Sequence, residues 1–230
     1  MESRGLKVNA GKTEVMVCAK QNETINVCDK HGTRLEQSTE FKYLGSTVET
    51  SGGCEREVAL RVKAAWRKWK EITPVICDRR MPIKLKTKLY KTIIRPVLLY
   101  GAETWTPRVK EIRLIQKTEM RMLRWIMGVT LHDKKRNEDI RRQLGVADIA
   151  EKVRETRLRW YGHVQRSEQY IKRAMEEKVT GSRSRGRQKL RWRDCVQNDL
   201  NHKHLLDQDP NDRKRWRQLT HVADPSPTRD

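Results

Sequence analysis

Six basic side chains recur at every second position late in the chain, and they are the residues best placed for chemistry: Arg183, Arg185, Arg187, Lys189, Arg191 and Arg193. No acidic residue lies between Gly181 and Arg193. In an extended chain alternate side chains share a face and are about 6.6 Å apart, close to the axial rise of about 6.8 Å for two nucleotides of one B-form strand. We predict an arm that follows a phosphate backbone. A flexible linker and a nuclear-import signal are the alternatives, because both need only the charge.

Bases also alternate with aromatic residues in the stretch Arg157-Leu-Arg-Trp-Tyr-Gly-His163. Such interleaving can stack nucleobases and hold phosphates, as in single-strand binders. Trp160 lies on an apolar stripe, however, so we interpret it as a packing residue. The same interpretation applies to the other tryptophans at helical spacing, Trp66, Trp69, Trp125, Trp192 and Trp216. We interpret His163 as a hydrogen-bonding group near a helix end and assign no histidine a catalytic role.

A charged row is expected on the helix between about Val109 and Met127, at spacings of four, four and three residues: Arg113, Lys117, Arg121 and Arg124. Residues at these spacings lie on one face of a helix. We interpret the row as a solvated face rather than a dedicated phosphate track.

The cysteines do not indicate a metal site. The five cysteines are scattered and include no C-x-x-C pair, which is typical of reduced intracellular thiols. Two groups of residues could supply part of a zinc site: Cys18, Cys28 and His31, and Cys195, His202 and His204. Neither group supplies four ligands at zinc-finger spacing. The stretch Asn9-Ala-Gly-Lys-Thr13 lacks the first glycine of a P-loop, because position 7 is lysine. We predict no metal and no bound nucleotide of that kind.

Charge is distributed very unevenly. Residues 1–60 hold 8 Lys and Arg against 9 Asp and Glu, while residues 61–230 hold 43 against 21, so the formal charge of +21 lies downstream. A basic excess of this size favours polyanionic partners, since each base placed on a phosphate releases condensed counterions. Nucleic acid is the first candidate, whether RNA, DNA or a hybrid, and an anionic membrane is the second. We predict a nucleic-acid partner, no membrane and no small-molecule substrate.

Localisation follows from what the sequence lacks. It has no run of about 18 apolar residues and no signal peptide at its start, so we expect an intracellular protein of the nucleus or cytoplasm.

The elements that must position these residues belong to an α+β fold. Residues 15–18, 24–28 and a stretch including Phe41, Tyr43 and Val48 have strand composition and predict a small antiparallel sheet of three strands. Ser51-Gly-Gly53 breaks the sheet. Helical periodicity follows over residues 55–72, after Pro82 with Pro96 ending or kinking that helix, and over residues 109–127 up to Gly128.

The remaining helices are shorter. Asn137 is expected to cap a helix that ends at Leu144-Gly145, and Asp148 caps the next. The arm leads into a helix with Trp192, Val196 and Leu200, and Asp209-Pro210 starts a last helix with Trp216 and Leu219 inward. Residues 223–230 are expected to form a frayed, disordered tail.

Several motifs occur in an order that resembles the end of a non-LTR (LINE-type) retrotransposon reverse transcriptase. They are Gly5-Leu-Lys-Val-Asn9 with Lys12-Thr-Glu14, Phe41-Lys-Tyr-Leu-Gly45, Leu99-Tyr-Gly-Ala-Glu-Thr-Trp105 and Arg121-Met-Leu-Arg-Trp-Ile-Met-Gly128. Leu158-Arg-Trp-Tyr-Gly-His-Val164, Gly181 through Trp192 and Asp212-Arg-Lys-Arg-Trp216 resemble the region that follows the polymerase in these elements.

This resemblance implies a division of the chain into parts. Residues 1–50 would be a remnant of the polymerase palm with motifs D and E, residues 51–130 a helical thumb, residues 131–180 a helical connector, and residues 181–222 the basic arm and C-terminal helices. By resemblance, Lys12 is the motif D lysine that helps protonate the departing pyrophosphate. Lys42, Tyr43, Leu44 and Gly45 belong to the motif E hairpin that grips the primer end.

The family's Tyr-Ala-Asp-Asp box would precede Gly5, and no Asp-Asp pair occurs anywhere in the sequence. Because polymerase chemistry needs two metal ions held by carboxylates, we expect a C-terminal fragment that binds nucleic acid and does not polymerise DNA by itself. No cofactor is expected in this chain, and Mg²⁺ is implied only for the full-length polymerase. The alternative is a stand-alone, non-enzymatic RNA- or DNA-binding protein or an inert remnant of a decayed element.

Overall fold

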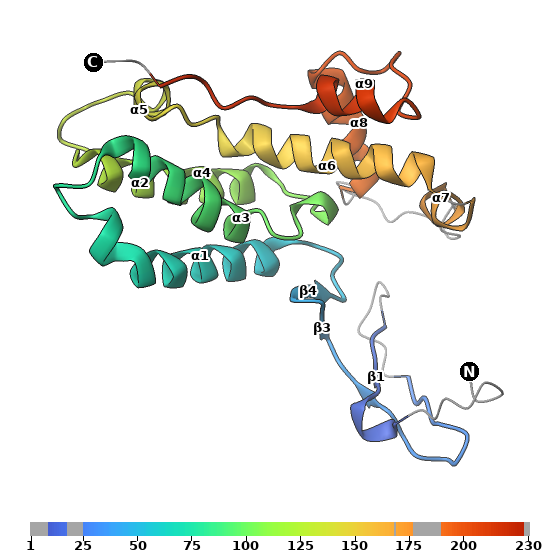
Figure 1. Cartoon of the computed structure of the whole chain (residues 1–230). Helices are drawn as coiled ribbons and strands as arrows, with labels where there is room; N and C mark the ends of the chain where they lie inside the picture. Colours follow the sequence, from blue (N-terminus) through green and yellow to red (C-terminus); the bar gives the residue numbers. More distant parts are fainter. Residues whose placement is uncertain (1–8, 18–24, 168, 177–189, 228–230) are drawn as a thin grey trace. The chain divides into compact units, whose positions relative to one another are not determined.

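The computed structural model describes residues 9–17, 25–167, 169–176 and 190–227, and the chain divides into two compact units, Met1–Glu57 and Val58–Asp230 (Figure 1). The first unit holds the strands and the second is helical, so the predicted α+β class is confirmed. The units are described separately below.

The first unit contains two small sheets. Strands β1 (Glu14–Val15) and β2 (Glu36–Gln37) pair in parallel, and β3 (Glu40–Tyr43) and β4 (Ser46–Glu49) form an antiparallel hairpin. The prediction of one three-stranded antiparallel sheet is therefore wrong. In the second predicted strand only Cys28 makes a bridge, to Arg34, because the chain turns back at once around Asp29. A short 3₁₀ turn, η2 (Ala10–Lys12), precedes β1.

The β3–β4 hairpin turns tightly at Leu44 and Gly45. Both residues have positive φ, 48° and 86°, as a two-residue turn of type I′ requires. Phe41 and Val48 lie opposite each other, so Phe41, Val48 and Tyr43 share one face of the hairpin. All three side chains are exposed, and this face contributes nothing to a core.

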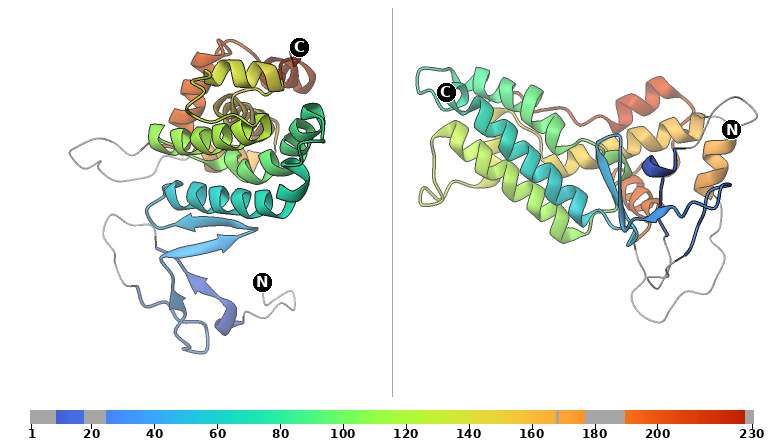
Figure 2. Two further views of the ribbon diagram at one scale, coloured as in Figure 1. Left: turned by 90° about the vertical axis from the view of Figure 1, so that its left-hand side faces the viewer. Right: turned by 90° about the horizontal axis from the view of Figure 1, so that it is seen from below.

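Helix α6 (Ile149–Arg166) packs against more elements of the second unit than any other helix, with α4 (Val109–Met127) below it and α9 (Arg213–Thr220) above it in Figure 1. Two further views of the same helices are given in Figure 2. The other elements are α1 (Glu55–Ile76), which starts in the first unit, and α2 (Ile83–Leu89), η3 (Tyr90–Ile94), α3 (Arg95–Leu98), η4 (Ala102–Thr104), α5 (Asn137–Leu144), α7 (Gln169–Glu176) and α8 (Trp192–His202).

Pro96 changes the helix that begins after Pro82. The segment η3 is a π-helical turn in which the Arg95 amide bonds back to the Tyr90 carbonyl, five residues earlier. Proline has no amide hydrogen, so Pro96 cannot donate to the carbonyl of Thr92 and the regular helical ladder is interrupted there. The predicted kink at Pro96 therefore takes the form of a π-turn followed by a final short helical segment, α3.

Helix ends in the second unit follow local sequence signals. Gly128 and Gly145 stop α4 and α5 in the left-handed conformation, and the Asp148 carboxylate accepts a hydrogen bond from the Ala150 amide at the start of α6, as predicted. Asn137 is the first residue of α5 rather than its cap, because Arg136 occupies the capping position.

Several buried polar side chains of the second unit pair with one another. The Tyr90 hydroxyl donates to Glu119 Oε1 at 2.7 Å, and burial raises the pKa of Tyr90 well above its ordinary value. Arg157 Nε donates to Asp199 Oδ2 at 2.7 Å between α6 and α8. Apolar packing against α6 centres on one group from α6, α8, α9 and the α8–α9 connection: Leu158, Val196, Leu200, Leu205 and Trp216. These contacts fix α4, α6 and α8 as a scaffold.

Residues 221–227, here the C-terminal strap, run back along the helices rather than fraying. Both oxygens of Asp224 accept hydrogen bonds from Arg95 Nη1 at 3.0 Å, and one accepts from the Ala147 amide at 2.9 Å. The Val222 amide donates to Glu155 at 3.2 Å. The expectation of a disordered tail is therefore wrong for the strap, and residues 228–230 lie outside the described residues.

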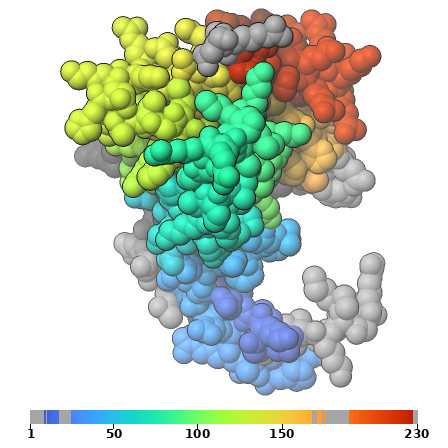
Figure 3. Space-filling model, turned by 60° about the vertical axis from the view of Figure 1, so that its left-hand side comes forward, coloured from blue at the N-terminus to red at the C-terminus, as the bar shows by residue number. Residues whose placement is uncertain are grey.

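Several side chains predicted to pack inward are open to solvent. Trp69 and Trp216 are buried as predicted, but Trp125 is 58% exposed and Trp160 is 39% exposed. Leu85 and Leu219 are exposed as well. In Figure 3 the yellow-green surface of α5 and its preceding loop lies beside the teal surface of α2.

Candidate nucleic-acid interface

The basic row predicted on α4 lies along one exposed edge of that helix. Arg113, Lys117 and Arg121 are exposed and Arg124 is half-buried, while the opposite face carries the buried residues Ile115, Met122, Leu123 and Ile126. With a rise of about 1.5 Å per residue, successive bases are separated along the axis by about 6, 6 and 4.5 Å. The edge therefore presents a regular line of positive charge.

No base of this row forms an ion pair with another described residue, and two of the four make no side-chain contact of the other kinds given below. Within the described residues Arg113 and Lys117 form no ion pair or hydrogen bond through their side chains. Arg121 lies with its guanidinium carbon 5.2 Å from the centre of the Trp66 ring, and Arg124 donates to Asn137 Oδ1 at 2.7 Å. Arg113 and Lys117 are consequently the members of the row available to an anion.

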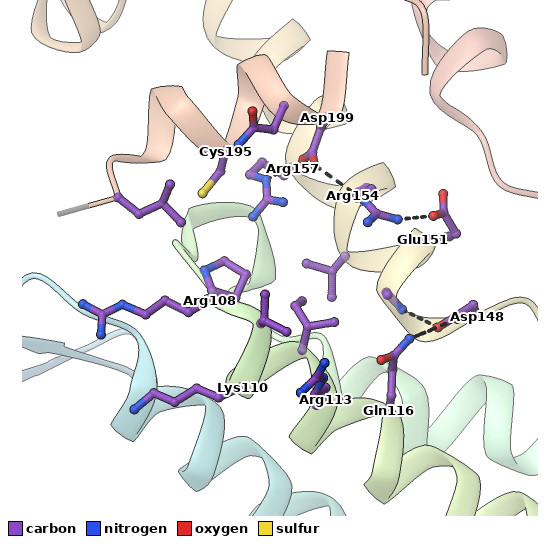
Figure 4. Close-up of a pocket in the computed structure, with 17 residues that line it drawn as sticks. Arg108, Lys110, Arg113, Gln116, Asp148, Glu151, Arg154, Arg157, Cys195 and Asp199 are labelled. Carbon is purple, nitrogen blue, oxygen red and sulfur yellow. Dashed lines mark hydrogen bonds and ion pairs between the residues drawn. The ribbon is translucent and has the colours of Figure 1, made fainter. Parts of the chain in front are cut away.

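A hollow of about 1050 Å³ lies beside the first turns of α4, between that helix, α6 and α8 (Figure 4). Arg108, Lys110 and Arg113 line it on the α4 side. Gln116 donates to both oxygens of Asp148 at 3.1 Å and so joins α4 to the start of α6. Positive side chains thus border the hollow where it opens along α4.

The arginines deeper in this hollow are neutralised. Arg157 pairs with Asp199 and also donates to the Trp105 carbonyl at 3.0 Å, and Arg154 pairs with Glu151 and with Asp199. Burial raises the pKa of the neighbouring Cys195 thiol, which keeps it protonated. The inner wall is therefore a closed set of ion pairs that positions α6 and α8.

A second hollow of about 1210 Å³ adjoins the later turns of α4, between that helix, α5 and the connection from Gly128 to Arg136. Arg113, Gln116 and Asp148 line both hollows, so the α4 edge borders the two in succession. Trp125 and Leu131, which are 58% and 77% exposed, line the second one. A nucleic-acid backbone that lay along the α4 edge would therefore reach the Trp125 ring at the end of that edge.

Trp125 is the residue of this surface that sequence reasoning missed. It follows Lys117 and Arg121 at steps of four residues, so it shares the charged edge of α4 and not the apolar one. That spacing was a usable signal, because an aromatic residue in line with bases presents a stacking face beside positive charge.

The four predicted hairpin residues lie together in the first unit. Lys42 and Tyr43 are at the end of β3, and Leu44 and Gly45 form the turn. Tyr43 and Leu44 are 62% and 75% exposed. The tip is thus a small apolar projection with one adjacent lysine.

Within the described residues no interaction joins Lys12 to that hairpin. It is exposed, at the end of η2, and the strand that follows pairs with β2 and not with β3 or β4. The Thr13 hydroxyl and the Lys12 amide both bond to the Asn9 carbonyl, which shapes the turn.

The predicted arm lies mostly outside the described residues, since Arg183, Arg185, Arg187 and Lys189 are not among them. Arg191 is extended, but Arg193 is already inside α8, where Asp194 accepts a hydrogen bond from the Arg191 amide at 2.9 Å. The alternating register consequently ends at Arg191, because a helix turns successive side chains by about 100° each. Both side chains are exposed.

Among the described residues no three of the His, Cys, Asp and Glu side chains lie close enough together to hold a metal ion. Across the same residues, no helix combines the length and the apolar composition that crossing a bilayer would require.

Similar proteins come from mobile elements. The chain is 28% identical over 208 residues to an uncharacterized transposon-derived protein of Caenorhabditis elegans, a match that covers 85% of this chain and 73% of the relative. It is 25% identical to the RNA-directed DNA polymerase from mobile element jockey of Drosophila melanogaster over 66% of the chain, and 25% identical to the jockey polymerase of Drosophila funebris over 81%. No protein-family model and no solved structure matches it.

These similarities support a retrotransposon-related protein, related to transposon-derived proteins and to the jockey polymerases. The chain spans only 17% and 21% of the length of the two fly polymerases. The activity in their names is theirs, and for this chain it enters only as a proposal below.

Proposed function

We propose that this chain binds nucleic acid along the α4 edge and serves as the nucleic-acid-binding C-terminal part of a non-LTR retrotransposon reverse transcriptase. The observation that carries the proposal is the pair Arg113 and Lys117, which are exposed and, in the described part of the chain, unpaired. The jockey polymerases among its relatives support the polymerase context.

The physical basis is counterion release. A base that sits on a phosphate displaces condensed cations, and the entropy of that release supplies affinity that weakens as salt rises. Arg113 and Lys117 can do so without first breaking an internal ion pair, whereas Arg154 and Arg157 would have to abandon buried carboxylates. Trp125 offers its exposed ring for base stacking at the end of the same edge.

Finer assignments extend this proposal through the family resemblance. The hairpin tip, from Lys42 to Gly45, would contact the primer end, and Lys12 would donate a proton to the departing pyrophosphate in a complete polymerase. The predicted arm from Arg183 to Arg193 would add phosphate contacts. Residues 51–130 would be the thumb, which places α4 at its end.

The test is a fluorescence-anisotropy titration of the full chain with labelled RNA, DNA and hybrid at several salt concentrations. Arg113→Ala combined with Lys117→Ala removes two phosphate contacts, so the slope of log K against log salt should fall by about 2. The matched control is Arg213→Ala with Lys214→Ala on α9, which removes the same charge from another exposed, unpaired site within the described residues.

We expect the α4 variant to bind more weakly than the α9 variant at every salt concentration. Equal weakening by the two variants would show that only net charge matters and would remove the α4 edge from the proposal. Wild-type protein that binds none of the three nucleic acids would contradict the function itself.

A further inference from the structure

A third, smaller hollow of about 330 Å³ lies at the far end of α6, away from the α4 edge. It is bordered by η4, α6, α7 and α8, and its lining is almost entirely apolar: Thr104, Trp160, Val164, Ile171, Met175 and Trp192. Ligand pockets in proteins span about 300 to 1,000 Å³, so this one is sized for a single flat group. A peptide helix or a duplex end would not fit.

Trp160 lies on the packed face of α6, and yet it is open. It is seven residues after Val153 and four before Val164, both buried, so all three share one helical face. The Trp160 side chain is nevertheless 39% exposed because the hollow lies against it. Its ring centre is 5.0 Å from that of His163, with the planes inclined by 31°.

Trp192 provides a second aromatic boundary, and this one is fixed. Its indole Nε1 donates to the Glu103 carbonyl at 2.7 Å, which anchors the side chain to η4. The Trp160 indole N–H, in contrast, has no acceptor within the described residues and stays available to a ligand. The hollow is therefore bordered by the anchored Trp192 ring and by the Trp160 ring, whose indole N–H is free to donate.

Exposed arginines lie next in sequence to the two tryptophans of this hollow, although none of them lines it. Arg191 and Arg193 flank Trp192 and are exposed, and Arg159 precedes Trp160 and is exposed as well. Asp194 is occupied in capping the start of α8, and Glu155, which lies 3.7 Å from Arg159, also binds the strap. The lining itself suits a flat, largely apolar group, and a nucleobase is such a group.

We propose that this hollow binds one unpaired nucleobase, with Trp160 as the stacking residue, and that the chain therefore prefers single-stranded nucleic acid to duplex. This inference depends on the nucleic-acid binding proposed above and adds a second site to it. A paired base cannot enter such a hollow, since its flat faces are covered by its neighbours in the stack. Selectivity for strandedness would thus come from Trp160, and general affinity from the α4 edge.

The experiment compares the full-length wild-type chain with Trp160→Ala. Binding of a labelled single-stranded oligothymidylate and of a blunt duplex of equal length is measured side by side at neutral pH. We expect Trp160→Ala to weaken single-strand binding about tenfold, the range of one lost base–aromatic stack, and to leave duplex binding unchanged. Trp160→Phe keeps an aromatic face and should retain most of the single-strand affinity.

Leu219→Ala is the matched control, an exposed apolar truncation on α9 outside the hollow. Equal single-strand affinity of wild type and Trp160→Ala would overturn the inference. An equal loss of affinity for the single strand and for the duplex would also overturn it, because it would mean that Trp160→Ala damages the fold. Circular dichroism of the helices and the behaviour of Trp160→Phe would reveal such damage. A wild-type chain that binds neither ligand would instead contradict the proposed function.

Discussion

Asp224 shows how a single side chain holds distant parts of the second unit together. It accepts from Arg95 in α3 and from the Ala147 amide before α6, and Lys91 lies 3.5 Å away. Burial by itself would raise the pKa of Asp224, but the hydrogen bonds from Arg95 and Ala147 outweigh it and hold the pKa below the usual value. The ionised form is therefore the one that stabilises the fold.

Asp224→Asn should lower the free energy of unfolding at neutral pH by on the order of 2 kcal/mol, since hydrogen bonds between charged groups are lost. A folded-state pKa below the unfolded value of about 3.9 means that this stabilisation is complete above about pH 5. It disappears as pH falls through the folded-state pKa. The free energies of unfolding of wild type and Asp224→Asn, measured in urea at a series of acidic pH values, should therefore converge as the pH falls.

The control is Asp207→Asn, an exposed carboxylate with no partner in the described part of the chain. Its unfolding should match wild type at every pH. A constant difference between wild type and Asp224→Asn down to the lowest pH would contradict the electrostatic account of the strap.

At the same scale, residue type and spacing predicted some side-chain environments and missed others. Trp69 and Trp216 pack inward as the periodicity indicates, and Trp125 and Trp160 do not. Periodicity marks one face of a helix, but it does not say which neighbour covers that face along its whole length. Trp160 lies on the correct face at a point where α7 and α8 leave it open, which only the packing of four elements determines.

Two glycines each end a helix in the left-handed conformation, but their surroundings differ. Gly128 after α4 and Gly145 after α5 have φ of 66° and 60°. A Cβ at Gly128 would meet no atom within 4 Å, whereas one at Gly145 would be 2.6 Å from the Pro225 carbonyl oxygen and 2.9 Å from Pro227 Cδ. The strap therefore packs directly against the end of α5.

Alanine at the two positions separates backbone strain from this packing. Gly128→Ala should cost about 1 to 2 kcal/mol, the penalty of a left-handed residue with a Cβ. Gly145→Ala should cost about 1 to 3 kcal/mol more, because the strap must shift. Denaturant unfolding of the pair measures the difference, and equal destabilisation would mean that the strap does not press on α5.

Elements were predictable to different degrees. The boundaries of α4 and α5 and the start of α6 follow from Gly128, Gly145 and Asp148, because caps and glycines act locally. In the first unit the sequence marked Phe41, Tyr43 and Val48 as strand residues, but it did not predict that they form a separate hairpin or that β1 pairs in parallel with β2. Of the candidate site, the positions of the α4 row were readable, but from the sequence alone we interpret the row as a solvated face and not as a phosphate track, because its freedom from ion pairs is not visible in the sequence.

For the whole molecule, burial is concentrated in one unit. In the part of the chain that the structure describes, Cys54 is the one buried apolar residue before Val58, and all the others belong to the helical unit. Phe41, Tyr43, Leu44 and Val48 are all exposed. A short sheet without a core of its own has little to oppose local opening.

Native-state hydrogen exchange should therefore divide the chain into two classes. Amides of β3 and β4 should exchange at rates near those of an unstructured chain, and amides in the centres of α4 and α6 should be the most protected, since their opening requires global unfolding. Mass spectrometry of proteolytic peptides after brief labelling measures this. Hairpin protection as strong as that of α4 would contradict the prediction.

The strap also has a consequence for the order in which the molecule folds. Arg95 and Asp224 are 129 residues apart in sequence, and closing a loop of that length costs about 4 kcal/mol of chain entropy. Such a contact is favourable only after the intervening helices have condensed and brought its ends together, so it belongs to the native side of the folding barrier. Interactions absent from the transition state govern the rate of unfolding rather than the rate of folding. We therefore expect the strap to slow the unfolding of the helical unit and to leave its rate of folding unchanged.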